Sequence, residues 1–376
     1  MARPGYDSVV LLTGLPSLYA RKMLEHVLAA EPRTLVYAVT PERSAAQMAA
    51  HVDGLQGRDR VVLLEGDPAS MDLGLSGAEV RQVAREVDRI HHLAHVSAVG
   101  VDRKTAEKMN VLATAEVIEL ARAAASSSLQ CLVHHSTAHV AGDRRGAVYE
   151  DELDAGQAFR SVIEETRMRA EQIARRAMRE VPIAVVRPTT MVGDSATGEI
   201  DRLDGLYLLV VLVIAAPAEI AIPLPGRGDV PLNIVPMDFV VRAAHAVGRH
   251  RTAPGRTFHL ADAHPLSARR VFELVARSSG RRAARSHIPS NLAKALLRAP
   301  GIERFVRSPR AFVEQLMTPV RYDTRNADPI LAGADIGCPP FESYVDALVR
   351  AVDDRLRERR ERRQSDADAE VDDPLS

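Results

Sequence analysis

The feature that most constrains the fold is a regular alternation of short apolar runs with longer helical patterns. The apolar runs are Ser8–Thr13, Thr34–Val39, Arg60–Leu64, Arg89–Leu93, Leu129–His134 and Ile183–Val186. Between them lie stretches with helical periodicity, such as Ser17–Ala30, Gly77–Val87, Ala106–Ala125 and Ala158–Arg179. Strands that are apolar on both sides are typical of a parallel sheet covered by helices on both faces. The pattern therefore predicts an α/β fold, a doubly wound parallel-sheet Rossmann fold whose ligands bind at the carboxyl ends of the strands.

The alternation loosens after about Gly198, although Phe239–Val247 still predicts a helix and Phe258–Ala261 a short strand. We assign residues 1–200 and about 230–265 to the Rossmann-like domain. A smaller C-terminal lobe, expected to cover the substrate, takes residues about 200–230 and 266–354. Residues 355–376 form a charged tail that begins as a helix and is predicted to be disordered from Ser365 onward.

Composition excludes several classes of function. The net charge of −1 gives no basis for binding nucleic acid. Two cysteines do not make a disulfide framework, and we expect a reducing compartment. The longest apolar run, Leu206–Pro217, is shorter than the roughly 20 residues that span a bilayer, so it predicts a buried helix. Met1–Tyr6 lacks the apolar region of a signal peptide. We therefore expect a cytoplasmic protein without a transmembrane segment; the oligomeric state is not encoded.

The segment after the first strand has the position of a dinucleotide-binding turn. Gly14 supplies the tight turn, while Ser17 and Ala20 stand where two further glycines are usual. The second glycine lets the backbone approach a pyrophosphate, and the third permits close helix–strand packing. Pro16 removes one backbone N–H from the loop. Loss of one donor to a charged group weakens binding by roughly 1–3 kcal/mol, so nucleotide binding is expected to be weakened.

Several later motifs occur in a characteristic order: Gly66-Asp67, His92-Leu93-Ala94-His95, Asn110-Val111, His135-Ser136-Thr137-Ala138-His139, Tyr149-Glu150-Asp151-Glu152-Leu153, Arg187-Pro188-Thr189 and Val235-Pro236-Met237-Asp238. Together with the first turn, they resemble the male-sterility/thioester-reductase branch of the extended short-chain dehydrogenases, relatives of fatty acyl-CoA reductases. The resemblance covers roughly residues 7 to 265. It implies reduction of an acyl thioester with NADP or NAD as the cofactor, and an acyl or carbonyl ligand carried on CoA or on a carrier protein.

The resemblance also implies where the cofactor binds. Asp67 matches the residue that contacts the adenine side, and Thr40, with Arg43 as a substitute, stands where NADP-preferring relatives often carry Arg. The full set of cofactor positions that we carry over is Gly14, Ser17, Ala20, Arg43, Asp67, Ala94, Asn110, Arg167 and Pro188.

The catalytic positions are incomplete. Thr137 matches the Ser/Thr that hydrogen-bonds the substrate carbonyl, but the positions of the family's Tyr and Lys fall at Ile163 and Arg167. No tyrosine in the chain is followed four residues later by lysine. Ile163 cannot transfer a proton, a role that contributes about 10²–10⁴ in rate. Arg167 keeps the positive charge that would hold the ribose, but with a different geometry.

Two residues are alternative proton donors, and one group is an alternative metal site. His139 follows Thr137 by two residues and could act near neutral pH; Tyr149 is a weaker substitute.

Histidines cluster at two strand ends, in His91-His92-x-x-His95 and His134-His135-x-x-x-His139. Because neighbouring residues of a strand face opposite sides of the sheet, we predict no metal site.

The sequence favours a degenerate short-chain dehydrogenase-like protein, with a nucleotide- or acyl-binding cleft, that is non-reducing and has a binding or regulatory role. An active NAD(P)H-dependent reductase of an acyl thioester or related carbonyl is the alternative. A third interpretation is a structural partner that binds no nucleotide.

Overall fold

The computed structural model describes residues 5–97, 100–201, 206–215, 222–225, 228–281, 283–288 and 318–371. Its contacts divide the chain into two units. The first unit comprises Met1–Met191, Asn233–His264 and Thr318–Cys338, and the second comprises Val192–Leu232, Pro265–Met317 and Pro339–Ser376. Thr318–Cys338, which we expected in the smaller lobe, belongs to the first unit.

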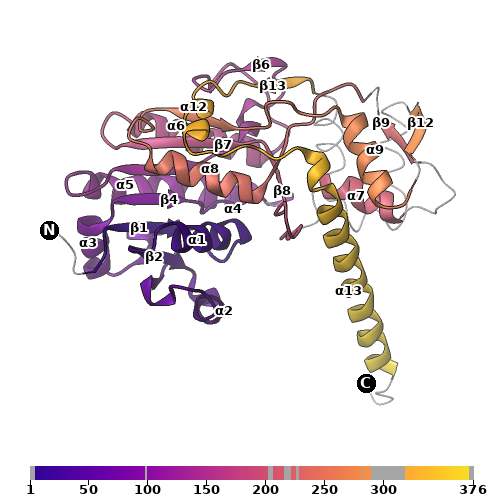
Figure 1. Cartoon of the computed structure of the whole chain (residues 1–376). Helices are drawn as coiled ribbons and strands as arrows, with labels where there is room; N and C mark the ends of the chain where they lie inside the picture. Colours follow the sequence, from indigo (N-terminus) through magenta and orange to yellow (C-terminus); the bar gives the residue numbers. More distant parts are fainter. Residues whose placement is uncertain are drawn as a thin grey trace. The chain divides into compact units, whose positions relative to one another are not determined.

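A seven-stranded parallel sheet forms the centre of the first unit (Figure 1), with the order β3-β2-β1-β4-β5-β7-β11. The strands are β1 (Ser8–Thr13), β2 (Thr34–Thr40), β3 (Val61–Glu65), β4 (Arg89–His92), β5 (Cys131–His135), β7 (Ile183–Pro188) and β11 (Thr257–Leu260). They coincide, within one or two residues at each end, with the runs that the sequence predicts as strands. The order reverses between β1 and β4, which is the switch point of a doubly wound Rossmann fold, so the predicted fold class is confirmed.

Helices cover both faces of the sheet. Val10 and Leu12 of β1 pack in one core cluster with α1 and α8, while Val9 and Leu11 pack in another with α3 and α5. The helices of this unit are α1 (Leu18–Ala30), α2 (Glu42–Asp53), α3 (Gly77–Glu86), α4 (Arg103–Ala106), α5 (Ala113–Ala125), α6 (Val162–Ala177), α8 (Met237–Arg249) and α12 (Ala327–Gly333). The predicted helix Ala106–Ala125 is interrupted by a π-helical turn at Glu107–Leu112. Burial on both faces explains why the strands are apolar throughout.

Two short strand pairs add to this unit. Strand β6 (Gly146–Val148) pairs in parallel with β13 (Val320–Tyr322), and β8 (Thr190–Val192) pairs with β10 (Ile234–Pro236). The first pair attaches Thr318–Cys338 to the loop that follows β5.

The second unit contains α7 (Leu206–Ala215), β9 (Ile222–Pro225), α9 (Ala268–Ser278), β12 (Ala283–Ile288) and α13 (Val345–Val371). Helices α7, α9 and α13 contact one another, and Leu206, Tyr207 and Val210 of α7 are buried. Within the described residues, the structure contains no helix that is both long and apolar enough to cross a membrane. Helix α13 continues past Ser365, where the sequence predicts disorder. Residues 372–376 lie outside the described part.

Candidate functional site

The turn between β1 and α1 retains one glycine, and the structure shows what the two replaced positions do. Gly14 has φ +102°, and a Cβ there would lie 2.6 Å from the carbonyl carbon of Leu93, so the turn requires glycine beside the end of β4. Ser17 is the N-cap of α1, where its Oγ accepts a hydrogen bond of 3.3 Å from the backbone N–H of Ala20. Ala20 itself is fully buried. The helix N-terminus that would face a phosphate is present, but Ser17 already occupies one of its donors.

The histidines of β4 and β5 divide between the two faces of the sheet. His91 and His135 lie on the face covered by α1 and α8, with Nδ1 of His91 3.1 Å from Nε2 of His135. His92 and His134 lie on the opposite face, with their rings stacked at 5.8 Å between centroids. The described residues contain no group of three metal ligands. Strand alternation separates the imidazoles, as expected from their positions in the sequence.

Tyr19, in the first turn of α1, joins the His91–His135 pair, and no motif in the sequence singles it out. Its hydroxyl lies 2.7 Å from Nδ1 of His135. Burial raises the pKa of Tyr19 above its usual range, against the opposing effect of the Arg167 charge, and burial lowers the pKa of His135 and His91. All three groups are therefore neutral near pH 7. In the part of the chain that the structure describes, Nε2 of His91 has no hydrogen-bond partner.

The three catalytic positions lie at the end of β5 and in α6. Thr137 is half-buried, and its Oγ1 accepts a hydrogen bond of 3.2 Å from the N–H of His139. Ile163 is half-buried in the first turn of α6. Arg167, one turn later, is 5% exposed and donates a hydrogen bond to the carbonyl of His135. Burial lowers the pKa of Arg167 to about 10, with the Glu171 charge acting in the opposite direction. The guanidinium is thus directed at the protein's own backbone.

Neither substitute proton donor has the required properties. Burial, with a smaller effect of the Arg160 charge, lowers the pKa of His139 to about 4, so its imidazole is neutral near pH 7 and is a poor general acid. Its Nε2 lies 3.4 Å from Oγ1 of Thr190. Tyr149 is exposed, and the guanidinium of Arg325 lies over its ring at 4.7 Å from the centroid.

Two cofactor positions at the carboxyl edge take part in buried hydrogen bonds. Asn110, in the π-helical turn, accepts from the N–H of Val96 and donates to Oγ1 of Thr166, both at 2.9 Å. The N–H of Ala94 donates to Oγ1 of Thr13 at 3.3 Å. These bonds join the ends of β1 and β4 to α6, so both residues are part of the hydrogen-bonded framework of this edge.

The positions assigned to the adenine side and to β7 differ in accessibility. Asp67 is partly exposed and forms an ion pair of 2.8 Å with Lys108, whose hydrogen bond lowers the pKa of Asp67 although burial opposes this. Arg43 is exposed in the first turn of α2 and makes no hydrogen bond or ion pair with the described residues. Thr40 is the last residue of β2 and is completely buried. Pro188 ends β7 and is buried.

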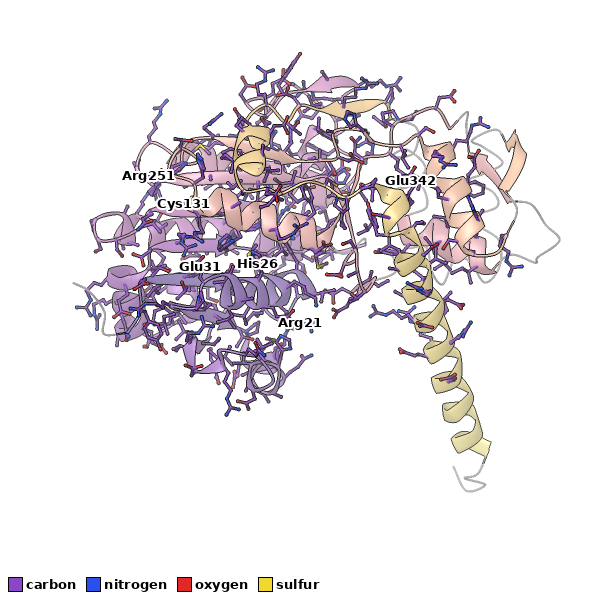
Figure 2. All side chains as sticks on the ribbon, viewed as in Figure 1. Arg21, His26, Glu31, Cys131, Arg251 and Glu342 are labelled. Atoms are coloured by element: carbon purple, nitrogen blue, oxygen red, sulfur yellow. The ribbon has the colours of Figure 1, made fainter. Side chains whose placement is uncertain are left out.

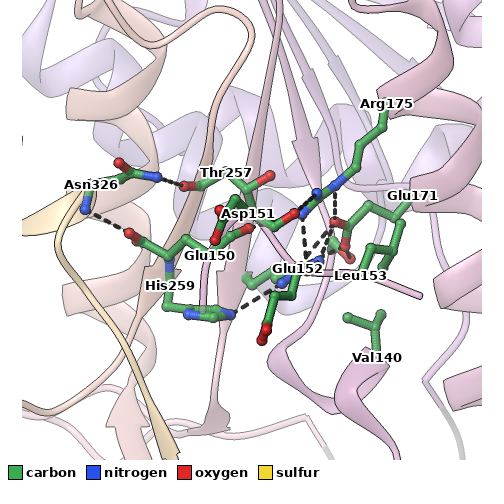
Figure 3. Close-up of polar contacts among 12 residues, drawn as sticks. Val140, Glu150, Asp151, Glu152, Leu153, Glu171, Arg175, Thr257, His259 and Asn326 are labelled. Carbon is green, nitrogen blue, oxygen red and sulfur yellow. Dashed lines mark hydrogen bonds and ion pairs between the residues drawn. The ribbon is translucent and has the colours of Figure 1, made fainter. Parts of the chain in front are cut away.

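A buried ion cluster beneath the catalytic edge was not predicted from the sequence (Figure 3). Glu171 of α6 pairs with Arg187 of β7 at 2.6 Å and with Arg175 at 2.9 Å. It also accepts a hydrogen bond of 2.6 Å from Ser136 Oγ. Arg187 also donates to the carbonyl of Glu152 at 2.8 Å. Burial raises the pKa of Glu171, but the charges of Arg187 and Arg175 and the hydrogen bonds from Arg187 and Ser136 together lower it to about 2. The cluster fixes the end of β5, and with it Thr137, relative to α6. The sequence feature that could have indicated this cluster is Arg187, a charged residue within an otherwise apolar strand.

Glu150 connects the same region to Thr318–Cys338. Its carboxylate accepts from the backbone N–H of His259 at 2.8 Å and of Asn326 at 2.6 Å, as Figure 3 shows. Burial raises the pKa of Glu150 to about 7, although both backbone hydrogen bonds oppose the shift. Tyr149-Glu150-Asp151-Glu152-Leu153 is therefore a structural connection in this fold.

A cavity of about 520 Å³ lies at the opposite, amino-terminal edge of the sheet. Beside it, Glu31 pairs with Arg89 and His245, and His245 lies 3.2 Å from His26; Figure 2 labels Glu31 and His26. Ligands of open α/β sheets bind at the carboxyl ends of the strands. The candidate site is therefore the edge formed by Gly14, Thr137 and Arg167, and this cavity is separate from it.

Known proteins resemble this chain over much of its length. The sequence profile of a family of NAD-binding domains described as male sterility protein matches residues 23–244, more than half of the chain. Among curated proteins, the fatty acyl-CoA reductase wat of Drosophila melanogaster is 22% identical over 279 residues, which is 63% of this chain and 53% of that protein. A linear gramicidin synthase protein of Brevibacillus parabrevis is 26% identical over 204 residues, which is 54% of this chain and 4% of the synthase. The chain thus spans about half of the fly protein and a small part of the synthase.

A similar fold occurs in the terminal R domain of the myxalamid PKS-NRPS pathway. Its TM-score is 0.76 at 19% identity, with 94% of this chain and 92% of that domain covered. This likeness concerns the fold.

Proposed function

Because the chain belongs to the male sterility protein family of NAD-binding domains, we propose that it is a member of this family that binds a nucleotide and an acyl ligand without reducing it. Its role is then binding or regulation. The observation that carries the proposal is the state of the catalytic pair: Ile163 offers no proton, and Arg167 is hydrogen-bonded to the backbone of His135.

The chemistry supports this choice. Reduction of a carbonyl needs a proton at its oxygen, and a positioned acid contributes about 10²–10⁴ in rate. His139 is neutral near pH 7, with its pKa at about 4, and Tyr149 is exposed beneath Arg325. Thr137 can still bind a carbonyl oxygen, because its hydroxyl keeps a hydrogen to donate while its oxygen accepts from His139.

The ligand class follows from the relatives. The fly protein is named as a fatty acyl-CoA reductase, the Brevibacillus protein as a linear gramicidin synthase subunit, and the myxalamid protein as the terminal R domain of a PKS-NRPS biosynthetic pathway. We therefore propose an acyl thioester on CoA or on a carrier protein as the second ligand, with NADP or NAD in the nucleotide cleft.

An acyl-CoA panel with NADPH and NADH tests the proposal. We expect nucleotide binding by calorimetry but no oxidation of the nucleotide above the rate without protein. The double variant Ile163→Tyr with Arg167→Lys should raise turnover, because it restores the acid and the ribose-binding cation. Oxidation by the unaltered protein that is lost in Thr137→Ala would contradict a non-reducing role. Absence of any nucleotide binding would favour a purely structural role instead.

An active reductase is the second candidate, favoured by one observation. The phenol of Tyr19 lies 2.7 Å from His135 at the same end of β5, beside the position of Arg167. If the unaltered protein oxidises NADPH, the variant Tyr19→Phe distinguishes a donor at this position from water, because only the former predicts a loss of about 10²-fold or more.

A further inference from the structure

We infer that the cleft recognises the adenosine diphosphate group of its ligand and does not hold the nicotinamide half. The inference rests on the proposed nucleotide binding and specifies which part of the ligand is bound. The same group occurs in ADP, in ADP-ribose, in the nicotinamide dinucleotides and, with an added phosphate, in CoA.

The adenine half of the site keeps its turn and an exposed cation, although Ser17 occupies one donor of the helix N-terminus. Gly14 keeps the conformation and the close approach to Leu93 that the turn requires, with φ +102°. The following helix presents its N-terminus at this turn, where phosphate groups bind. Arg43 is an exposed cation without a partner in the described part of the chain, on the helix that follows β2. These features lie at the ends of β1 and β2, on one side of the switch point.

The nicotinamide half has changed in three connected places. Ile163 removes a hydroxyl, and Arg167, at the position of the ribose-holding lysine, donates to the carbonyl of His135. Tyr19 lies with its hydroxyl 2.7 Å from the same histidine and is only 6% exposed. His135 thus contacts both polar side chains: its backbone carbonyl accepts from Arg167, and its imidazole lies beside the hydroxyl of Tyr19.

This arrangement disfavours a nicotinamide riboside. Arg167 is only 5% exposed, so reaching a ribose diol would require its side chain to move outward, and a move that broke the bond to the His135 carbonyl would leave that buried acceptor unpaired, which is unfavourable. Ile163 could not replace the lost hydrogen bond. The ribose and nicotinamide would therefore gain no polar contact from these three residues, and the residues present do not fit this half of the dinucleotide.

Calorimetric titration of the whole chain with ADP, ADP-ribose, NADH, nicotinamide mononucleotide and CoA tests the inference. We expect ADP, ADP-ribose and NADH to bind with affinities within about threefold of one another, and nicotinamide mononucleotide not to bind. The fluorescence of NADH should stay that of the free nucleotide, because its reduced ring remains in water. If CoA binds as tightly as ADP, CoA is a ligand through which the protein can bind the adenosine diphosphate group.

Two other outcomes distinguish a failure of this inference from a failure of nucleotide binding itself. NADH binding at least tenfold tighter than ADP, with a change in nicotinamide fluorescence, would overturn the inference and leave nucleotide binding intact. If none of the ligands binds, nucleotide binding itself fails, and the inference fails with it.

The variant Arg167→Lys provides a second measure. Lysine cannot reproduce the planar guanidinium contact and is free to reach a ribose, so we expect the preference for NADH over ADP to rise at least threefold. Arg169→Lys, on the same helix but paired with Glu107 at the surface, is the matched control and should leave this ratio unchanged. An unchanged ratio in a folded Arg167→Lys protein contradicts the assigned role of Arg167. Should that variant fail to fold, the ligand series on the unaltered protein decides.

Discussion

At the scale of single residues, Glu171 is the most constrained side chain near the site. It is fully buried and is held by two arginines and the hydroxyl of Ser136. Its role differs from that of Arg167, which is also buried but contacts a backbone carbonyl. One charge is satisfied by a cluster of partners, whereas the other is satisfied by a neutral acceptor.

We expect Glu171→Gln to lower the free energy of unfolding by about 3–5 kcal/mol, because it leaves the buried charge of Arg187 without its counter-ion. Urea denaturation at pH 7 measures the change. Glu107→Gln is the control, since Glu107 pairs with Arg169 on the surface, where exposed pairs contribute about 0–1 kcal/mol. Equal effects of the two substitutions would show that the cluster does not stabilise the fold.

Helix α1 is the element in which stability and ligand binding conflict. Ser17 caps the helix with an oxygen that accepts an N–H from the first turn. A phosphate at this end of the helix would need the same donors. The serine thus stabilises the helix at a position where a glycine would leave the donors open.

The variant Ser17→Gly should bind ADP more tightly, by about fivefold to 150-fold, because one donor to a charged group is worth about 1–3 kcal/mol. Its unfolding free energy should fall by only a few tenths of a kcal/mol, whereas Ser17→Ala should lose about 1 kcal/mol. Calorimetry and urea denaturation on both variants provide the comparison. Unchanged ADP affinity in Ser17→Gly would mean that the cap does not compete with the ligand.

The elements of the first unit could largely be predicted because their apolar runs and helical periods are local properties of the sequence. The strand at Ser8–Thr13 is found as predicted, and Ser17 marks the start of the first helix. The direction of a polar side chain depends on contacts between distant segments, so Tyr19, 116 residues from His135, could not be recognised in this way. Arg167 was correctly placed on α6, but its hydrogen bond to a backbone carbonyl becomes visible only in three dimensions.

At the scale of the whole molecule, histidines whose pKa is lowered on folding dominate the expected response to pH. Among the described residues, burial lowers the pKa of seven of them: His26, His91, His92, His134, His135, His139 and His259. Unfolded histidine titrates near about 6.5, so below that pH the unfolded chain binds protons that the folded chain does not. Glu150 acts in the opposite sense: its pKa is raised to about 7, so its contribution is lost as pH rises through 7.

The seven histidines stabilise the fold as pH rises, whereas Glu150 acts in the opposite sense. We therefore expect the free energy of unfolding to rise between pH 5 and pH 7. Each histidine contributes at most about 1.4 kcal/mol per pH unit in this window. Urea denaturation at pH 5, 6, 7 and 8 measures the slope, and His26→Gln should reduce it while the exposed His250→Gln should not. Stability that is flat or falls over this range would contradict the neutral state of these imidazoles.

The placement of His91 and His135 on one face, and of His92 and His134 on the other, also bears on how the sheet finds its strand register. A one-residue slip of β4 or β5 would exchange these faces. A slip that brings Ser136 to the place of His135 would remove the imidazole partner of Tyr19, and one that brings Leu93 to the place of His92 would remove the partner of Thr114, which lies 3.2 Å from Nε2 of His92. A sheet misaligned in this direction would therefore bury unpaired hydroxyl groups. The hydroxyl–imidazole pairs therefore favour the observed register of β4 and β5 more strongly than Val, Leu and Ile side chains alone would.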